Sequence, residues 1–252
     1  AAGTMFLAPP AGLKTAPVSL RDNLDRCPDE NSFWALIRSQ FLFPDNYTYL
    51  NTGGIGAVPV PVLTEVRRDM EKDQLHPSPG HSHSAWKKIK TETCPVLSPA
   101  CSADEIALVS TATEGINIIV NGLDLRQGDE VITSAHEHPA LGIPLLNRKQ
   151  RDGIKIRIFE PDLDTTAGNV ERIEELITSR TKLIFISHIT CTTGQCFPIR
   201  EIGKLARANN IIFALDGAQA AGTMEMDIMA DNVDCYTFSG HKWLLGPKRT
   251  GV

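Results

Sequence analysis

The sequence places a lysine and an acid where neither is expected simply to contact water. Lys242 follows His241 shortly after the apolar run 235–238. Partial desolvation near other cations makes a lysine a nucleophile for carbonyl groups, although Lys242 taken alone also fits a surface lysine. Asp216 directly follows the apolar run 211–215, where a carboxylate is costly to leave unpaired. It therefore needs a partner, and a metal ion, a ribose or a protonated ring nitrogen would each serve.

Two segments between expected strands and helices have residues suited to binding a ligand. The segment 110–117 (STATEGIN) offers small and hydroxyl residues at a helix start, where free backbone N–H groups suit a phosphate. An ordinary threonine N-cap is the alternative. The segment 135–140 places His138 at another helix start, where its flat ring could lie against a planar ligand. The motifs G-x-x-x-x-G-K-[ST] and G-x-G-x-x-G are missing, which argues against nucleotide binding and against a dinucleotide-dependent oxidoreductase.

The histidines do not favour a metal site. His136, Glu137 and His138 stand at a helix entrance, where neighbouring side chains point in divergent directions. The loop 76–84 is dominated by Pro and Ser. Its three histidines, His76, His81 and His83, have no regular ligand spacing. No metal is predicted.

Taken together, these segments change the interpretation of Lys242. A phosphate-binding turn, a planar side chain, an acid and a nucleophilic lysine follow one another along the chain. Pyridoxal 5′-phosphate (PLP) needs such a set, because a lysine must trap its aldehyde and an acid must keep its ring nitrogen protonated. The sequence thus predicts a PLP site.

These residues require an α/β scaffold to position them. Short Val/Ile/Leu-rich runs alternate with amphipathic segments, which indicates a parallel sheet buried on both faces in an open, doubly wound arrangement. In such sheets ligands bind beyond the carboxyl ends of the strands. Strands are predicted over 47–51, 105–110, 130–134, 155–159, 182–187, 211–215 and 235–238. Helices are predicted over 30–41, from residue 59 or 61 to about 74, and over 85–96, 113–121, 139–151, 170–178, 199–209 and 218–224.

Composition excludes several classes of protein. The 252 residues carry a net charge of −5, with no dense Lys/Arg cluster, so neither nucleic acid nor an anionic membrane is an expected partner. No apolar run is long enough to span a bilayer. The six cysteines are scattered without a C-x-x-C pair, which is typical of reduced thiols. We expect a cytoplasmic protein, while the small-residue start at Ala1 leaves export after cleavage open.

The sequence resembles the class V aminotransferase group of fold-type I PLP-dependent enzymes. The resemblance rests on TATEGIN, HEHPA, SHITCTTGQ, DGAQAAG and SGHKWLLGPKRTG, which match the motifs of that group in order, and it extends from Tyr49 to the last residue. Within the group, TYLNTGGIG and HKWLLGPK look most similar to the isopenicillin-N epimerase-like branch. Cysteine desulfurases and cysteine/cystine C–S lyases form the neighbouring branches.

The resemblance implies roles for individual residues. Lys242 would form a Schiff base with PLP and move the proton at Cα of an amino-acid substrate, Asp216 would pair with the pyridinium nitrogen, and His138 would stack on the ring. Gln219 would donate a hydrogen bond to the ring oxygen. The phosphate would be held by Ala112, Thr113, Ser239 and His241, and the substrate side would be formed by Asn51, Gly53 and Cys191.

Two departures from the desulfurase pattern weaken that assignment. Ala112 stands where desulfurases commonly have a second Thr, and Cys191 stands where they have an Asn. An epimerase-like reaction at Cα is therefore preferred, with C–S lysis or cysteine desulfuration as alternatives. None of the six cysteines can be assigned as the desulfurase nucleophile. The non-enzyme alternative is a degenerate fold-type I module that only binds a partner.

The resemblance also implies a domain organisation. Residues 1–48 would form an N-terminal arm and a helix, and residues 49–252 a PLP-binding large domain, incomplete at its C-terminal end. The small domain that carries the substrate-carboxylate arginine in such enzymes is expected to be missing from this chain. A homodimer is expected, with the loop 76–84 as a candidate to reach the cofactor of the partner subunit.

Overall fold

The structure, a computed structural model, describes residues 23–77 and 82–252. These residues belong to two units, one ending at Asp45 and the other spanning Asn46–Val252. In the first unit, α2 (Glu30–Ser39) begins at Asp29, whose side chain accepts a hydrogen bond of 2.7 Å from the Ser32 N–H. The predicted helix over 30–41 is thus present and ends slightly earlier. Most of the predicted N-terminal arm lies outside the described residues, and the boundary predicted at 48/49 stays a prediction.

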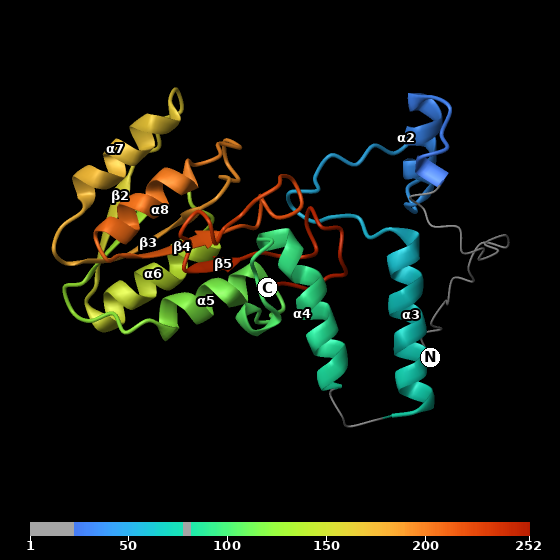
Figure 1. The fold of residues 1–252 in the computed structure, drawn as a ribbon, viewed down its shortest axis with the longest axis horizontal. Helices are drawn as coiled ribbons and strands as arrows, with labels where there is room; N and C mark the ends of the chain where they lie inside the picture. The colour runs from blue at the N-terminus through green and yellow to red at the C-terminus, as the bar shows by residue number, and fades with distance from the viewer. Residues whose placement is uncertain (1–22, 78–81) are drawn as a thin grey trace, which may run out of the picture. The chain divides into compact units, whose positions relative to one another are not determined.

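The second unit is built on a parallel sheet in the strand order β2-β1-β3-β4-β5 (Figure 1). The predicted α/β fold with a parallel sheet between helices is confirmed. Each strand coincides with a predicted run to within one residue, and in the three central strands Val, Ile, Leu and Phe fill a sheet that is covered on both faces. The strands are β1 (Glu130–Ser134), β2 (Lys155–Phe159), β3 (Thr181–Ser187), β4 (Ile212–Asp216) and β5 (Cys235–Thr237).

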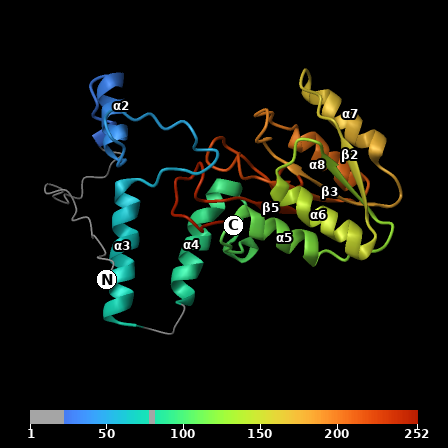
Figure 2. The ribbon, with the colours of Figure 1, turned by 180° about the vertical axis from the view of Figure 1, so that it is seen from behind.

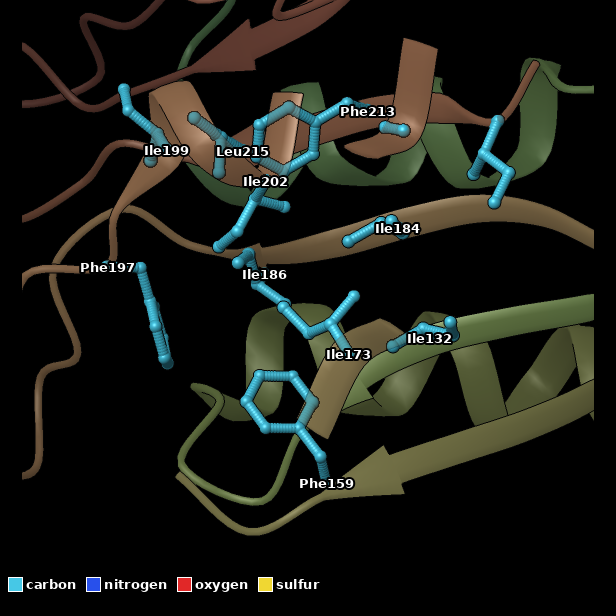
Figure 3. Close-up of a cluster of buried hydrophobic side chains, with 12 residues drawn as sticks. Ile132, Phe159, Ile173, Ile184, Ile186, Phe197, Ile199, Ile202, Phe213 and Leu215 are labelled. Carbon is cyan, nitrogen blue, oxygen red and sulfur yellow. The ribbon is translucent and has the colours of Figure 1, made fainter. Parts of the chain in front are cut away.

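Helices cover both faces of this sheet (Figures 1 and 2). Alternate residues of β3 point to opposite faces: Leu183 packs in the cluster with α5 and α6, whereas Ile184 packs in the cluster with α7 and α8. Figure 3 shows the second cluster, in which side chains from the strands meet Ile173 and Ile202. Burying each of these side chains stabilises the fold by about 1.5–3 kcal/mol. The helices are α5 (Ala112–Gly122), α6 (Pro139–Asp152), α7 (Thr166–Leu176) and α8 (Ile199–Ala208).

Two long helices precede the sheet in the chain. They are α3 (Val60–Leu75) and α4 (His83–Leu97), close to the predicted positions. α3 buries none of its residues, and α4 buries only Cys94 and Leu97. The predicted loop 76–84 is shorter than expected, and residues 78–81, which include His81, lie outside the described part. Among the described residues, no helix is long and apolar enough to cross a membrane.

Three predicted elements are wrong. Residues 47–51 and 105–110 are not strands, and 218–224 is a series of turns. A strand needs a paired neighbour, and the segment 105–110 has only one antiparallel bridge, from Val109 to Gly251. The short 3₁₀ helix η1 (Ala103–Glu105) precedes this bridge. The segment 218–224 forms turns instead of a helix, and Gly222 in it adopts a φ of 92° in the left-handed region, which glycine adopts readily.

A buried arginine joins α5 to α6. Arg148 is 4% exposed, and its guanidinium donates to the carbonyl oxygens of Val120 at 2.6 Å and Leu125 at 3.0 Å. It also forms an ion pair with Asp152. These carbonyls lie at or beyond the C-terminal end of α5, where a helix leaves acceptors unpaired and a cation is favourable.

We expect Arg148→Met to lower the free energy of unfolding by about 3 kcal/mol, because it leaves the buried carbonyl groups of Val120 and Leu125 without their donor, while Asp152 keeps its bond from Arg151. Urea denaturation followed by circular dichroism measures this change. Arg151→Met is the matched control on the same helix, since the Arg151 side chain is 61% exposed and its loss should change stability little. Equal losses in the two variants would contradict the bridging role of Arg148.

Candidate active site

The predicted site residues all line one cavity of about 800 Å³ at the carboxyl ends of the central strands. They come from separate parts of the chain, and the parallel strand order brings their segments to the same edge of the sheet. The predicted residues in its lining are Asn51, Gly53, Ala112, Thr113, His138, Cys191, Asp216, Gln219, Ser239, His241 and Lys242.

Lys242 lies on a closely bonded turn that follows β5. The Gly240 N–H donates to the Thr250 carbonyl and the Gly246 N–H donates to the Gly240 carbonyl, both at 2.8 Å. The turn also receives a bond of 2.7 Å from the Gly56 N–H to the His241 carbonyl. A Cβ at Gly56 would lie 2.1 Å from the Lys242 carbonyl oxygen, so only glycine permits this approach. The backbone of Lys242 is therefore held in place, and its half-buried side chain lines the cavity.

Asp216 ends β4 and is only 5% exposed. Its Oδ1 accepts a hydrogen bond of 2.9 Å from the Ala218 N–H, and among the described residues no ion pair or side-chain hydrogen bond reaches the carboxylate. Burial raises the pKa of Asp216, while the Ala218 amide and the charges of Lys242 and His138 oppose the rise. The carboxyl group is thus buried without an ion-pair partner in the described part of the chain, and the nearby Lys242 and His138 side chains line the cavity.

The N-terminus of α5 forms another wall of the cavity. Thr111 is its N-cap and accepts a hydrogen bond of 3.1 Å from the Glu114 N–H, so the ordinary capping role is present. The Ala112 N–H donates to Ser239 Oγ at 2.9 Å, which joins the start of α5 to the segment after β5. Thr113 is exposed. His241 Nδ1, by contrast, is buried without a hydrogen-bond partner among the described residues.

His138 is the N-cap of α6. Its Nδ1 accepts a hydrogen bond of 3.0 Å from the Ala140 N–H, which fixes the imidazole ring and places the proton of the neutral ring on Nε2. His138 and Pro139 therefore begin the helix as the sequence suggested, and the ring lines the cavity.

A carboxylate that the sequence analysis did not assign holds the turn before His138. Glu137 accepts hydrogen bonds from Ser134 Oγ at 2.5 Å and from Ser187 Oγ at 2.7 Å, and its oxygens also accept from the Ser187 N–H. These bonds connect the ends of β1 and β3. Burial raises the pKa of Glu137, and the charge of Asp216 contributes to the rise. Only the strand order could reveal this contact, because no local pattern links Glu137 to Ser187.

The residues that the resemblance places on the substrate side lie on two turns. The Asn51 carbonyl accepts hydrogen bonds from the N–H groups of Gly54 at 3.0 Å and Ile55 at 3.1 Å. Cys191 is exposed and stands on the turn between β3 and α8. Trp243, which the sequence analysis passed over, also lines the cavity, and its place directly after Lys242 was an available signal.

All six cysteines are free thiols. Within the described part of the chain, no group of His, Cys, Asp and Glu side chains is arranged to hold a metal ion.

Comparison with known proteins points to one family. The family model described as aminotransferase class-V matches residues 76–252. A probable cysteine desulfurase of Methanothermobacter thermautotrophicus is 36% identical over 152 residues, which cover 60% of this chain and 37% of that protein.

Solved structures agree with this relationship. The cysteine desulfurase CsdA from Escherichia coli, in an S-sulfonic acid form, superposes with a TM-score of 0.75 at 26% identity over 86% of this chain and 56% of its own. A mutant of C-DES with glycine covalently linked to the PLP cofactor gives a TM-score of 0.73 at 28% identity over 85% of this chain and 58% of its own. The chain thus spans between about a third and three-fifths of the length of these proteins. The family match covers most of the chain, and the chain belongs to the aminotransferase class-V family.

Proposed function

We propose that the protein is a PLP-dependent enzyme that acts on an amino acid. The observation that carries this proposal is the single cavity in which Lys242, the buried carboxylate of Asp216, the fixed imidazole of His138 and the N-terminus of α5 meet. The family and the PLP-linked neighbour support the same cofactor. The intact set of costly residues argues against a degenerate module without activity.

The residues fit PLP at several points of the cavity. Asp216 is a buried carboxyl group without a bonded cation among the described residues, which suits a protonated ring nitrogen. The unpartnered His241 Nδ1 and the start of α5 suit a phosphate, because both can supply N–H groups toward an anion. The Ala112 N–H already bonds Ser239, so the phosphate contact predicted for that amide stays a prediction.

When bound, PLP supplies an electron sink that stabilises negative charge at the substrate Cα. In our proposal Lys242 provides the amine that holds the cofactor and the base that takes the Cα proton. Asp216 would keep the ring nitrogen protonated, and His138 would stack on the ring. Glu137 acts indirectly, since it holds the turn that carries His138 against the end of β3.

For the reaction, we propose cleavage of a C–S bond in a sulfur-containing amino acid. The sequence favoured an epimerase-like reaction, but the relatives are cysteine desulfurases, and a second C-DES structure is described as a cystine C–S lyase with cysteine persulfide. This cystine C–S lyase superposes with a TM-score of 0.71 at 28% identity. These relatives support the alternative better than epimerisation. The departures at Ala112 and Cys191 remain differences from the desulfurase pattern.

We also infer a homodimer in a reducing compartment. Apolar side chains on α3 and α4 are exposed, among them Met70 at 65% and Ile89 at 48%, which suits coverage by a second subunit. Six free thiols suit a reducing compartment such as the cytoplasm. The contribution of the loop 76–84 to a partner's site belongs to the same inference.

We expect Lys242→Ala to abolish the visible absorbance band that the protein gains on incubation with PLP. Borohydride reduction of the wild type should attach the cofactor to the peptide that contains Lys242, as mass spectrometry can show. Lys248→Ala is the matched control, because Lys248 is exposed on the same segment and is not among the cavity-lining residues. A wild-type protein without any band would refute the proposal.

Asp216→Asn should raise the stability of the cofactor-free protein at neutral pH. Because the pKa of Asp216 is raised in the folded state, its ionised form opposes folding, and Asn keeps the acceptor for the Ala218 N–H. The gain should be missing below about pH 3.8, the ordinary pKa of the group, and should grow as the pH rises through the raised folded pKa. Thermal unfolding across this pH range measures it.

The control for this variant has the opposite sign. Hydrogen bonds from Ser98 and Ala230 lower the pKa of Asp227, so its charge favours folding. Asp227→Asn should therefore destabilise the protein at neutral pH, and the loss should vanish as the pH falls through the lowered pKa. A destabilised Asp216→Asn variant at neutral pH would contradict the assignment of Asp216 as a buried, costly anion.

Incubation of the PLP-loaded protein with cysteine, cystine and amino acids without sulfur tests the reaction. We expect sulfide, pyruvate and ammonia from cysteine, and cysteine persulfide, pyruvate and ammonia from cystine. Amino acids without sulfur should give no such release, and Lys242→Ala should lose it. Loss of optical rotation without release of sulfur would favour epimerisation instead.

A further inference from the structure

Trp243 forms a hydrogen-bonded chain with two residues from distant parts of the sequence. Its indole Nε1–H donates to Gln219 Oε1 at 2.7 Å, and Gln219 Nε2 donates to the Gly53 carbonyl at 3.0 Å. All three residues line the cavity. These hydrogen bonds connect the residue after Lys242, through the turn after β4, to the glycine-rich turn at 51–56.

The chemistry of the partners sets the orientation of the Gln219 amide. An indole N–H is only a donor and a backbone carbonyl is only an acceptor. The amide oxygen must therefore face Trp243, and the amide nitrogen must face Gly53. The second N–H of this nitrogen has no acceptor among the described residues, so one donor remains available beside the cavity.

The same hydrogen bonds hold the glycine-rich turn at 51–56 against the segment that carries Lys242. A Cβ at Gly53 would lie 3.0 Å from Gln219 Oε1 and 3.4 Å from Trp243 Cζ2, so the turn packs directly on both side chains. The Gly56 N–H bonds the His241 carbonyl at 2.7 Å on the other side of the turn. The position of Asn51, at the start of this turn, therefore depends on contacts with residues that flank Lys242.

Trp243 itself is not a buried core residue. It is 37% exposed, and its indole edge, rather than extensive packing, makes the polar contact. Packing alone does not explain a tryptophan at such an exposed position. The geometry therefore favours a role through the N–H group.

We propose that Trp243 is a positioning residue: its indole N–H fixes the Gln219 amide so that one amide N–H faces a bound cofactor or substrate and the turn at 51–56 stays closed over Lys242. This inference rests on the proposed function, because it assumes that the cavity binds PLP. Gln219 makes the contact, and Trp243 acts through it.

Trp243→Phe tests the proposal because it keeps an aromatic ring and removes only the donor. We expect PLP to bind about fivefold more weakly, as for the loss of one neutral hydrogen bond. The absorbance maximum of the bound cofactor should also shift, since hydrogen bonds to the ring tune its electronic state. Trp34→Phe is the matched control: it removes an indole N–H bond, 3.2 Å long, to Glu30 on α2, and Trp34 is not among the residues that line the cavity.

A double-mutant cycle with Gln219→Leu separates positioning from a general effect on the fold. If Trp243 acts through Gln219, Trp243→Phe should change neither PLP affinity nor the absorbance maximum in the Gln219→Leu background. Equal effects of Trp243→Phe in both backgrounds, or an unchanged maximum in the single variant, would overturn the proposal. Should Trp243→Phe fold poorly, Gln219→Glu gives a second test: it removes the amide donors while keeping an acceptor for Trp243, and should weaken PLP binding at least as much.

The failure of this inference differs from the failure of the proposed function. A wild-type protein that does not bind PLP refutes the proposed function. A wild-type protein that binds PLP, together with a Trp243→Phe variant of the same affinity and spectrum, refutes only the role of Trp243.

Discussion

Asp216 carries a carboxylate at the end of a strand that is covered on both faces, with 5% of the residue exposed. Ionising a carboxyl group in this place costs free energy, and within the described residues only the hydrogen bond from the Ala218 N–H offsets part of that cost. Gly217 follows Asp216 where the Tyr236 ring leaves no room for a side chain, since a Cβ there would lie 2.1 Å from that ring. Burial raises the pKa of Asp216, and Lys242 and His138 in the cavity above it oppose this rise. The rest of the site is arranged around this buried charge.

Parallel strand pairing explains how so many segments reach the same carboxylate. In the register, Ser187 of β3 pairs with Asp216, and Asp216 pairs with Thr237 of β5. Each strand therefore releases its following turn at the same edge of the sheet. Glu137 joins the turn after β1 to the end of β3, and Ser239 joins the segment after β5 to the start of α5. The site is thus held by bonds between neighbouring strand ends, which makes its geometry a consequence of the core below it.

The success and failure of the sequence predictions follow from where each segment finds its partners. The strands over 130–134 and 182–187 are recognisable because their apolar runs pack between two layers of helices. Residues 47–51 and 105–110 have similar local composition but lack a continuous neighbouring strand, so they remain irregular. The segment 218–224 has helix-favouring alanines, yet it forms turns in which Gly222 takes a positive φ and Gln219 lines the cavity.

The sequence by itself determined the chemical parts of this protein: a lysine, an acid and an imidazole after apolar runs, and small hydroxyl residues at a helix start, in an order that matches one family. Those features are local, so residue type and spacing are enough to reveal them. Only the tertiary structure decided how the parts are held. Glu137 meets Ser187 across 50 residues, Trp243 meets Gln219 across 24, and Gln219 meets Gly53 across 166. Contacts of this kind depend on strand order and backbone approach, and no periodicity along the chain encodes them.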